Sequence, residues 1–251
     1  MPGAPYLSVV IPVFEEADNL EPLHAQLTAA LDAVPGGVEW IYVDDGSRDA
    51  TPERLRELAK RDPRVRILTH AANCGQTAAL DAGFRAAQGE VVATLDADLQ
   101  NDPADLPRLL RELERADVVN GVREQRMDGW VRCVSSRIGN GFRNWITGES
   151  VSDVGCSLRV MRTRYLRQVK LFRGMHRFLP TLLRMEGARV VEVPVNHRPR
   201  RHGTSKYGIA NRLFTGLVDL CAVRWMQSRR LDYRLREPDP ASPPPASRPP
   251  A

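Results

Sequence analysis

Short apolar runs rich in β-branched residues alternate with helical patterns in the first half of the chain, and no other feature constrains the fold as strongly. The strand-like runs are Leu7–Val13, Val38–Val43, Val65–Leu68 and Val91–Leu95. The helical patterns between them are Leu20–Ala33, Pro52–Lys60 and Gln76–Ala87. Continuous apolar strands separated by helices are typical of parallel sheets covered on both faces. The alternation predicts an α/β fold with a single doubly wound, mostly parallel sheet.

The second half of the chain continues this pattern less regularly. Its expected elements are a helix Asp105–Glu114, strands Val118–Val122 and Val190–Val195, a mostly helical Arg-rich stretch Gln125–Gly148 and a helix Ile209–Met226. In the last helix we expect Leu217, Leu220 and Cys221 on the apolar side and Asp219 on the polar side. Residues 237–251 include seven prolines, which cannot donate backbone hydrogen bonds. We predict a folded domain over 1–208, an amphipathic segment over 209–236 and a disordered tail over 237–251.

Charge is distributed unevenly along the 251 residues. Residues 1–120 hold 11 Lys and Arg against 21 Asp and Glu, whereas residues 121–251 hold 25 against 10. A basic second half predicts an anionic partner such as a phosphate or a membrane surface. Basic and aromatic residues are not interleaved, which argues against a nucleic-acid-binding module, and no G-x-G-x-x-G follows the first strand, which disfavours a dinucleotide-binding oxidoreductase. No signal peptide, membrane span or disulfide scaffold is expected.

Acidic residues follow three of the predicted strands, in Pro12–Glu16, Asp44–Ser47 and Asp96–Gln100. Ligands of open parallel sheets bind at the carboxyl ends of the strands, so these segments are expected to meet at one edge. Taken alone, Asp96–Asp98 is more typical of a helix N-cap with first-turn acids, Asp44–Ser47 fits a capped turn equally well, and Pro12–Glu15 also fits a strand end and turn. Three such groups at one edge would repel each other unless a cation and a polar ligand lay between them. Asp96, Asp98 and Gln100 offer oxygen ligands that suit Mg²⁺ or Mn²⁺.

Four motifs in this order resemble the family 2 glycosyltransferases, which have the glycosyltransferase-A fold. They are S-V-V-I-P-V-F-E-E at Ser8–Glu16, V-D-D-G-S at Val43–Ser47, N-C-G-Q at Asn73–Gln76 and L-D-A-D-L-Q at Leu95–Gln100. Further segments are similar to the polyprenol-phosphate branch, which includes dolichol-phosphate mannosyltransferases and undecaprenyl-phosphate sugar transferases. They are G-V-R at Gly121–Arg123, the Arg-rich stretch to Asn140, D-V-G-C-S-L-R at Asp153–Arg159 and R-x-x-G-x-S-K-Y at Arg200–Tyr207. The resemblance covers residues 7–228.

The resemblance implies a role for each matching residue. Donor binding falls to Pro12, Phe14, Glu15, Asp44, Asp45, Asn73, Gln76, Asp96, Ala97, Arg200, Ser205 and Lys206, the last two in a loop that closes over the site. The metal and diphosphate motif consists of Asp96, Asp98 and Gln100. Arg123 and Arg137 face the acceptor phosphate, and Asp153 is an orienting carboxylate. The residues expected to act in catalysis are Asp98, Asp153, Arg123 and Arg137.

The reaction implied is metal-dependent, inverting transfer of a sugar from a UDP- or GDP-sugar to a polyprenyl phosphate, by an enzyme peripheral to the cytoplasmic face of the membrane. A metal ion would neutralise the departing diphosphate. The acceptor phosphate is its own nucleophile, so positioning by arginine matters more than a general base. Many relatives continue into transmembrane helices, whereas arginines and the Pro-rich tail follow here.

Three questions stay open at the level of sequence. The helix Ile209–Met226, with Trp225 and the arginines after it, would either lie in an anionic membrane interface or pack on the sheet, and a small membrane-embedded partner would serve the same need. A saccharide or protein acceptor would require a general base, for which Asp153 is the candidate. A nucleotide-sugar-binding scaffold is the alternative that is not an enzyme.

Overall fold

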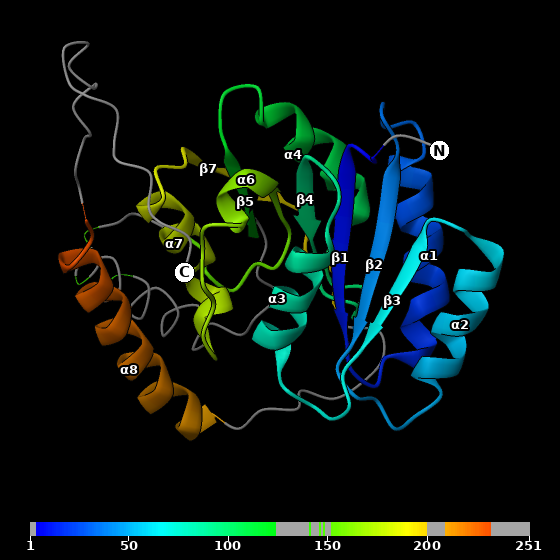
Figure 1. Ribbon diagram of the computed structural model, residues 1–251, viewed down its shortest axis with the longest axis horizontal. Coiled ribbons are helices and arrows are strands. Elements are labelled where there is room, and N and C mark those ends of the chain that lie inside the picture. Colours follow the sequence, from blue (N-terminus) through cyan, green and yellow to red (C-terminus); the bar gives the residue numbers. More distant parts are fainter. Residues whose placement is uncertain are drawn as a thin grey trace, which may run out of the picture.

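The structure is a computed structural model that describes residues 4–123, 141, 146, 148, 152–199 and 209–231 (Figure 1). Its strands are β1 Leu7–Val13, β2 Val38–Asp44, β3 Val65–Thr69, β4 Val91–Thr94, β5 Val118–Arg123, β6 Arg159–Arg162 and β7 Val190–Val195. Its helices are α1 Ala17–Leu31, α2 Thr51–Arg61, α3 Gln76–Ala86, η1 Pro103–Asp105, α4 Leu106–Glu112, α6 Thr163–Leu166, η2 Met175–Phe178, α7 Leu179–Met185 and α8 Ile209–Ser228. The strands form one sheet in the order β3-β2-β1-β4-β6-β5-β7. The predicted α/β fold with a single, mostly parallel sheet is confirmed.

One strand runs against the others. β6 pairs antiparallel with both β4 and β5, while β1, β2, β3 and β4 pair in parallel and β5 pairs in parallel with β7. Its first residue, Arg159, lies opposite Thr94 and Asn120. A reversed strand begins where its parallel neighbours end, so Arg159 lies at the carboxyl edge of the sheet. The sequence pattern did not reveal this strand because it is short and has arginine at both ends.

The sheet is covered on both faces, as the apolar strands predict. Along β1, Val9 and Ile11 point into a core shared with α1, α2 and α4, while Val10 between them points into a second core shared with α3, α6 and α7. Adjacent side chains on a strand face opposite sides, so one apolar run supplies both cores. Figure 1 shows α1 and α2 on one side of β1 and β2 and α3 on the other.

The final helix, α8, packs away from the sheet (Figure 1). Leu220 and Val223 are buried in a third apolar cluster with Met175, Phe178 and Leu182 of η2 and α7. Leu217 and Cys221, expected on the buried side, are exposed instead. The difference arises because the docked side is set by the partner surface, whereas apolar residues occupy both sides of this helix.

The exposed side of α8 carries Leu217, Val218 and Trp225, which are 40%, 53% and 63% exposed. Of the helices in the described parts of the chain, none is both long enough and apolar enough to cross a membrane.

We predict opposite effects of alanine at two helical glycines. A Cβ on Gly83 of α3 would lie 2.3 Å from Val10 Cγ1, so Gly83→Ala forces α3 away from β1, whereas a Cβ on Gly216 of α8 meets nothing within 4 Å. Overpacking costs about 1–3 kcal/mol, while alanine in an open helical position gains about 0.5–1 kcal/mol. Urea denaturation of the two variants measures both effects. Equal stability of the variants would contradict the close packing of α3 on β1.

Candidate functional site

A cavity of about 450 Å³ opens at the carboxyl ends of β1 and β4. Its polar lining consists of Gln76, Thr94, Asp96, Gln100, Arg123, Ser157, Arg159, His176 and Arg177, and Pro12 contributes to its apolar part. A larger surface hollow of about 680 Å³ lies between α1 and α2, away from these strand ends, and exposed ion pairs such as Arg61–Glu21 line it. The chemistry therefore points to the smaller cavity, where six segments of the chain converge.

Oxygen ligands on one side of this cavity come from the loop after β4. Asp96 and Gln100 line the cavity, and the Gln76 amide donates to Asp96 Oδ1 at 2.7 Å. Asp98 is buried below the loop, and its Oδ1 accepts a hydrogen bond from the Gln100 amide N–H at 3.2 Å. The donor set is entirely oxygen, which fits Mg²⁺ or Mn²⁺.

Two residues beside the cavity hold left-handed backbone conformations that side chains disfavour. Leu99, after β4, has φ of 62°, and Glu15, after β1, has φ of 53°. The Glu15 amide N–H donates to Ser47 Oγ at 2.9 Å, which ties the loop after β1 to the loop after β2. Such strain of about 1–3 kcal/mol per residue clusters at functional sites, and both loops are the ones that the sequence motifs single out.

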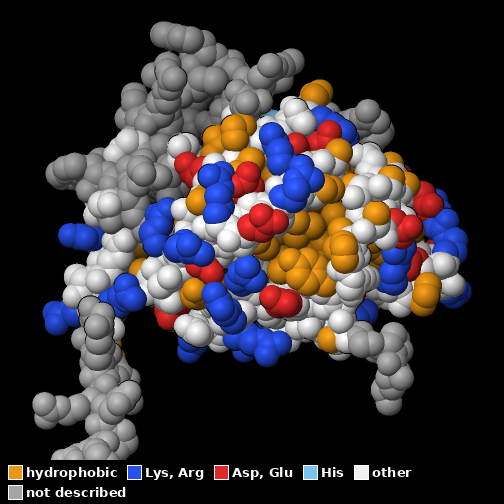
Figure 2. Space-filling model, turned by 90° about the horizontal axis from the view of Figure 1, so that it is seen from above, with side chains coloured by type: hydrophobic (Ala, Val, Ile, Leu, Met, Phe, Trp, Pro, Cys, Tyr) orange, Lys and Arg blue, Asp and Glu red, His pale blue; other side chains and the backbone are white. Residues whose placement is uncertain are grey.

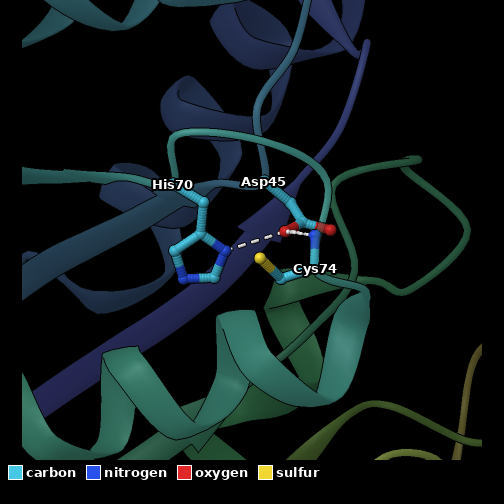
Figure 3. Close-up of side chains that lie close together, drawn as sticks. All are labelled: Asp45, His70 and Cys74. Carbon is cyan, nitrogen blue, oxygen red and sulfur yellow. Dashed lines mark hydrogen bonds and ion pairs between the residues drawn. The ribbon is translucent and has the colours of Figure 1, made fainter.

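Asp45 organises the loop that follows β3 (Figure 3). Its Oδ1 accepts hydrogen bonds from His70 Nδ1 and the Cys74 amide, both at 2.8 Å, and its Oδ2 accepts one from the Gly75 amide at 2.8 Å. The Asp45, His70 and Cys74 ligand atoms lie within 4.8 Å of one another, a juxtaposition that the spacing of the histidines did not suggest. The Cys74 thiol donates to the Ala72 carbonyl. These bonds explain the cluster as a clamp on the loop that carries Asn73 and Gln76.

The carboxylate of the neighbouring Asp44 is hydrogen-bonded less completely than that of Asp45. It is 1% exposed, and its Oδ1 accepts from the Ser47 amide at 3.0 Å. Its Oδ2 has no hydrogen-bond partner in the described part of the chain. A buried acceptor without a donor is costly, so this oxygen is a buried side-chain atom of the V-D-D-G-S motif that the described residues leave unsatisfied.

Asp153 and Arg123 form a buried ion pair at the other side of the cavity. The Arg123 guanidinium donates to both carboxylate oxygens, with Nε to Oδ2 at 2.7 Å and Nη2 to Oδ1 at 2.9 Å. The Gly155 amide also donates to Oδ1 at 3.1 Å. A bidentate pair of this kind fixes the arginine side chain, and it ties the end of β5 to the loop before β6.

Five polar residues of the cavity were missed as site residues by the analysis of the sequence: Thr94, Ser157, Arg159, His176 and Arg177. Arg159 is fully buried, and its guanidinium donates to Asn120 Oδ1 at 2.8 Å and to the carbonyls of His176 at 2.9 Å and Val154 at 3.2 Å. All three acceptors are neutral. Arg159 belongs to a recognised motif, which was the available signal, whereas nothing in the local sequence marks η2 as part of the site.

His176 is held in its neutral form. Thr77 Oγ1 accepts a hydrogen bond from the Gly174 amide at 3.0 Å and is hydrogen-bonded to His176 Nδ1 at 2.7 Å. Burial, followed by the charges of Arg177 and Arg159, lowers the pKa of His176 from 6.5 to about 3.

Some predicted site residues lie outside the described part of the chain, namely Arg137, Arg200, Ser205 and Lys206. The segment that leads toward the last three is described. The Arg198 amide donates to the Gln100 carbonyl at 2.8 Å, and Asn101 forms a bridge with His197. The chain after β7 therefore passes beside the loop that carries the predicted metal ligands.

We predict a pH-dependent contribution of His176 to stability. Because its pKa is about 3 in the fold, only the unfolded chain takes up this proton between pH 6.5 and 3. The contribution is complete above pH 6.5 and declines by up to about 1.4 kcal/mol per pH unit below it. Urea titrations from pH 7 to pH 4 are therefore expected to show the wild type losing stability faster than His176→Gln. A constant difference between the two proteins would contradict the assignment.

We also predict that Asp45→Asn loosens the loop after β3. The asparagine amide group would face N–H donors that the carboxylate now accepts, so the free energy of unfolding is expected to fall by about 1–3 kcal/mol. The control is Asp81→Asn, which removes an exposed ion pair with Arg85 and is expected to cost at most about 1 kcal/mol. Chemical denaturation distinguishes them, and a loss no larger than the control would show that the clamp is dispensable.

The sequence matches the family described as Glycosyl transferase family 2 over residues 8–170. The dodecaprenyl-phosphate galacturonate synthase of Rhizobium johnstonii is 42% identical over 223 residues, covering 86% of this chain and 66% of that protein. The undecaprenyl-phosphate 4-deoxy-4-formamido-L-arabinose transferase of Edwardsiella ictaluri is 42% identical over 206 residues, covering 81% of this chain and 63% of that protein. The chain thus spans slightly less than two thirds of the length of these relatives.

Solved structures share the fold at low sequence identity. A mannosyltransferase from Pyrobaculum calidifontis, in complex with GDP-Man and Mn²⁺, matches 92% of this chain and 66% of its own with a TM-score of 0.63 and 20% identity. The glucosyl-3-phosphoglycerate synthase of Mycobacterium tuberculosis, in complex with Mn²⁺, uridine diphosphate and glucosyl-3-phosphoglycerate, matches 92% and 82% with a TM-score of 0.65 and 19% identity. These likenesses confirm the expected glycosyltransferase-A fold.

Proposed function

Because this chain belongs to glycosyl transferase family 2, we propose that it transfers a sugar from a UDP- or GDP-sugar to a polyprenyl phosphate, with inversion and with Mg²⁺ or Mn²⁺. The relatives at 42% identity are named as transferases that use dodecaprenyl or undecaprenyl phosphate. Solved proteins of the same fold contain Mn²⁺ with a nucleotide or nucleotide sugar. The domain over 1–208 would carry the catalysis.

The observation that carries the proposal is the division of one cavity into an acidic side and a basic side. Asp96 and Gln100 face it from the loop after β4, and Arg123, Arg159 and Arg177 face it from β5, β6 and η2. Two anionic substrates that must react with each other need this arrangement. Asp96, Asp98 and Gln100 would hold a metal ion, which would supply positive charge to the donor diphosphate, and the arginines would hold a second phosphate.

On the donor side we assign the metal ion to Asp96, Asp98 and Gln100, where it would supply Lewis-acid stabilisation of the leaving diphosphate. Gln76 orients the Asp96 carboxylate. Asp44, with its unsatisfied Oδ2, together with Pro12, Phe14, Glu15 and Asp45, would hold the nucleoside. Asn73, Ala97, Arg200, Ser205 and Lys206 complete the proposed donor site.

The reaction needs no proton transfer. An oxygen of the acceptor phosphate attacks the anomeric carbon, the bond from that carbon to the donor phosphate oxygen breaks, and the nucleoside diphosphate leaves with the electron pair. A saccharide or protein acceptor would need a base such as Asp153, but that carboxylate accepts two hydrogen bonds from Arg123 and one from Gly155. The geometry of Asp153 supports an orienting role for this carboxylate, and we propose that Arg123 and Arg137 contact the acceptor phosphate.

We expect Asp96→Asn to reduce sugar transfer by at least about 100-fold, because a neutral amide cannot hold the cation against the diphosphate. The assay measures radiolabel moved from a panel of UDP- and GDP-sugars to undecaprenyl phosphate in detergent, with and without Mn²⁺. The control is Asp81→Asn, an exposed α3 carboxylate outside the cavity, which should retain activity. Transfer that persists without metal or in Asp96→Asn would refute the metal assignment, and nucleotide release without lipid labelling would refute the acceptor class.

We also propose that the exposed side of α8 lies on the cytoplasmic face of a membrane. The side opposite its buried residues exposes Leu217, Val218 and Trp225, with the exposed Arg224 beside them and Arg229 just after the helix. Apolar and basic side chains on one surface suit an anionic lipid interface. On the face that Figure 2 shows, acidic and basic side chains are interspersed around an apolar area.

Vesicle cosedimentation tests this surface. Val218→Glu/Trp225→Glu is expected to lower binding to vesicles that contain anionic lipid at least about tenfold, since it replaces inserted apolar groups with charge. The matched control, Ala25→Glu/Ala29→Glu, adds the same charge to two exposed positions of α1 and should bind like the wild type. Equal binding of both double variants would contradict the assignment of α8.

A further inference from the structure

We infer that Arg177 contacts the phosphate of the acceptor lipid. This inference rests on the proposed function and assigns it a binding residue that the sequence motifs did not suggest. Arg177 lies in η2 and lines the same cavity as Asp96 and Gln100.

The three described arginines of the cavity differ in how far their guanidinium groups are already paired with other groups of the protein. Arg123 is neutralised by Asp153 through two short hydrogen bonds. Arg159 is fully buried, and its guanidinium is occupied by three neutral acceptors that fix it as part of the wall. Arg177 is half-buried, and within the described chain its guanidinium forms no hydrogen bond and no ion pair within 4 Å. It is therefore the described cavity arginine whose hydrogen-bond donors remain available to a ligand.

The backbone that carries Arg177 is held from two sides. Gly174, at φ of 85°, donates through its amide to Thr77 Oγ1, and His176 Nδ1 is hydrogen-bonded to the same hydroxyl. From the cavity wall, Arg159 donates to the His176 carbonyl. These bonds fix Gly174 and His176, the two residues that lead into Arg177, relative to α3 and β6. A side chain on so fixed a segment binds a ligand with little loss of backbone freedom.

Arg177 also lies on the path that a lipid head group would take. The inner side of α8 packs on η2, where a Cβ on Gly174 would lie only 2.5 Å from Asp219 Oδ2. Burial raises the pKa of Asp219, and the charge of Arg177 opposes this shift, so the two side chains lie within electrostatic reach. Arg177 thus stands between the helix that exposes apolar groups and the cavity that contains Asp96.

A phosphate monoester suits this position because it carries charge and several strong acceptor oxygens. The planar guanidinium donates two parallel hydrogen bonds to such a group, whereas an ammonium acts as a single point charge. We therefore expect lysine at position 177 to restore part of the affinity and glutamine to restore none.

The test measures binding of undecaprenyl phosphate, with undecaprenol as the uncharged probe, to the full chain in detergent. Arg177→Gln is expected to lose undecaprenyl phosphate affinity about 10- to 100-fold, the effect of removing a hydrogen bond to a charged group, and to bind undecaprenol like the wild type. Arg177→Lys is expected to fall between. The matched control is Arg173→Gln, which removes an exposed arginine of the same segment that does not line the cavity and should bind both lipids normally.

The outcomes separate this inference from the proposed function. If the wild type binds undecaprenyl phosphate no better than undecaprenol, the proposed acceptor class is wrong. If it prefers the phosphate and Arg177→Gln retains that preference, the role of Arg177 is wrong while the proposed function stands. Binding of UDP or GDP with Mn²⁺ should be unchanged in Arg177→Gln, and a parallel loss of nucleotide affinity would instead mean that the substitution disrupts the whole cavity.

Discussion

The reversed pairing of β6 between β4 and β5 is the constraint on which the rest of the site depends. It brings Arg159 to the carboxyl edge of the sheet, directly opposite Thr94 and Asn120. There the buried Arg159 guanidinium donates to the carbonyls of Val154 and His176. These hydrogen bonds hold the loop before β6 and η2 in place. Because burial of a charged group is unfavourable unless its donors are satisfied, these bonds are required by the fold. They also fix two walls of the cavity in one geometry.

The carboxylates around the cavity show how a protein holds many like charges at one edge. Asp45 is satisfied by backbone amides and His70, and Asp153 by Arg123. Asp96 accepts a hydrogen bond from Gln76 at the cavity wall. Asp45 and Asp153 therefore stabilise loops, while the loop after β4 presents oxygen to a ligand. This separation of structural and ligand-facing acids is consistent with a diphosphate and a divalent cation on that side.

The sequence predicted the parallel part of the sheet well because each of those strands is a continuous apolar run with a helix after it. Val38 and Val65 begin strands where expected, and Leu7–Val13 matches β1 at both ends. β6 and η2 escaped prediction because short segments with arginine, histidine or proline have no clear periodicity. Their structure is set by tertiary contacts, such as the pairing of β6 with two neighbours and the bonds from Thr77 to η2.

The residues of the candidate site divide in the same way: local motifs predicted some of them, and only tertiary contacts revealed the others. The motifs located Asp96, Gln100, Gln76 and Pro12, all of which line the cavity, and family membership is confirmed by the match over residues 8–170. They did not indicate that Arg177, far from these motifs in sequence, lies in the same cavity. The apolar pattern of the sequence also could not reveal which side of α8 packs against η2 and α7, since Leu217 and Leu220 are equally apolar. Only burial in the third apolar cluster distinguishes Leu220 from the exposed Leu217.

The central claim is that the donor metal ion and the acceptor phosphate occupy opposite sides of one cavity. It is tested most directly by phosphorus NMR of a short polyprenyl monophosphate bound in the presence of UDP or GDP and Mn²⁺. The account predicts strong paramagnetic broadening of the monophosphate line, which is absent with Mg²⁺ and in Asp96→Asn. A sharp line with Mn²⁺, from a lipid phosphate shown to be bound, would contradict it, because the two groups would then be too far apart to react.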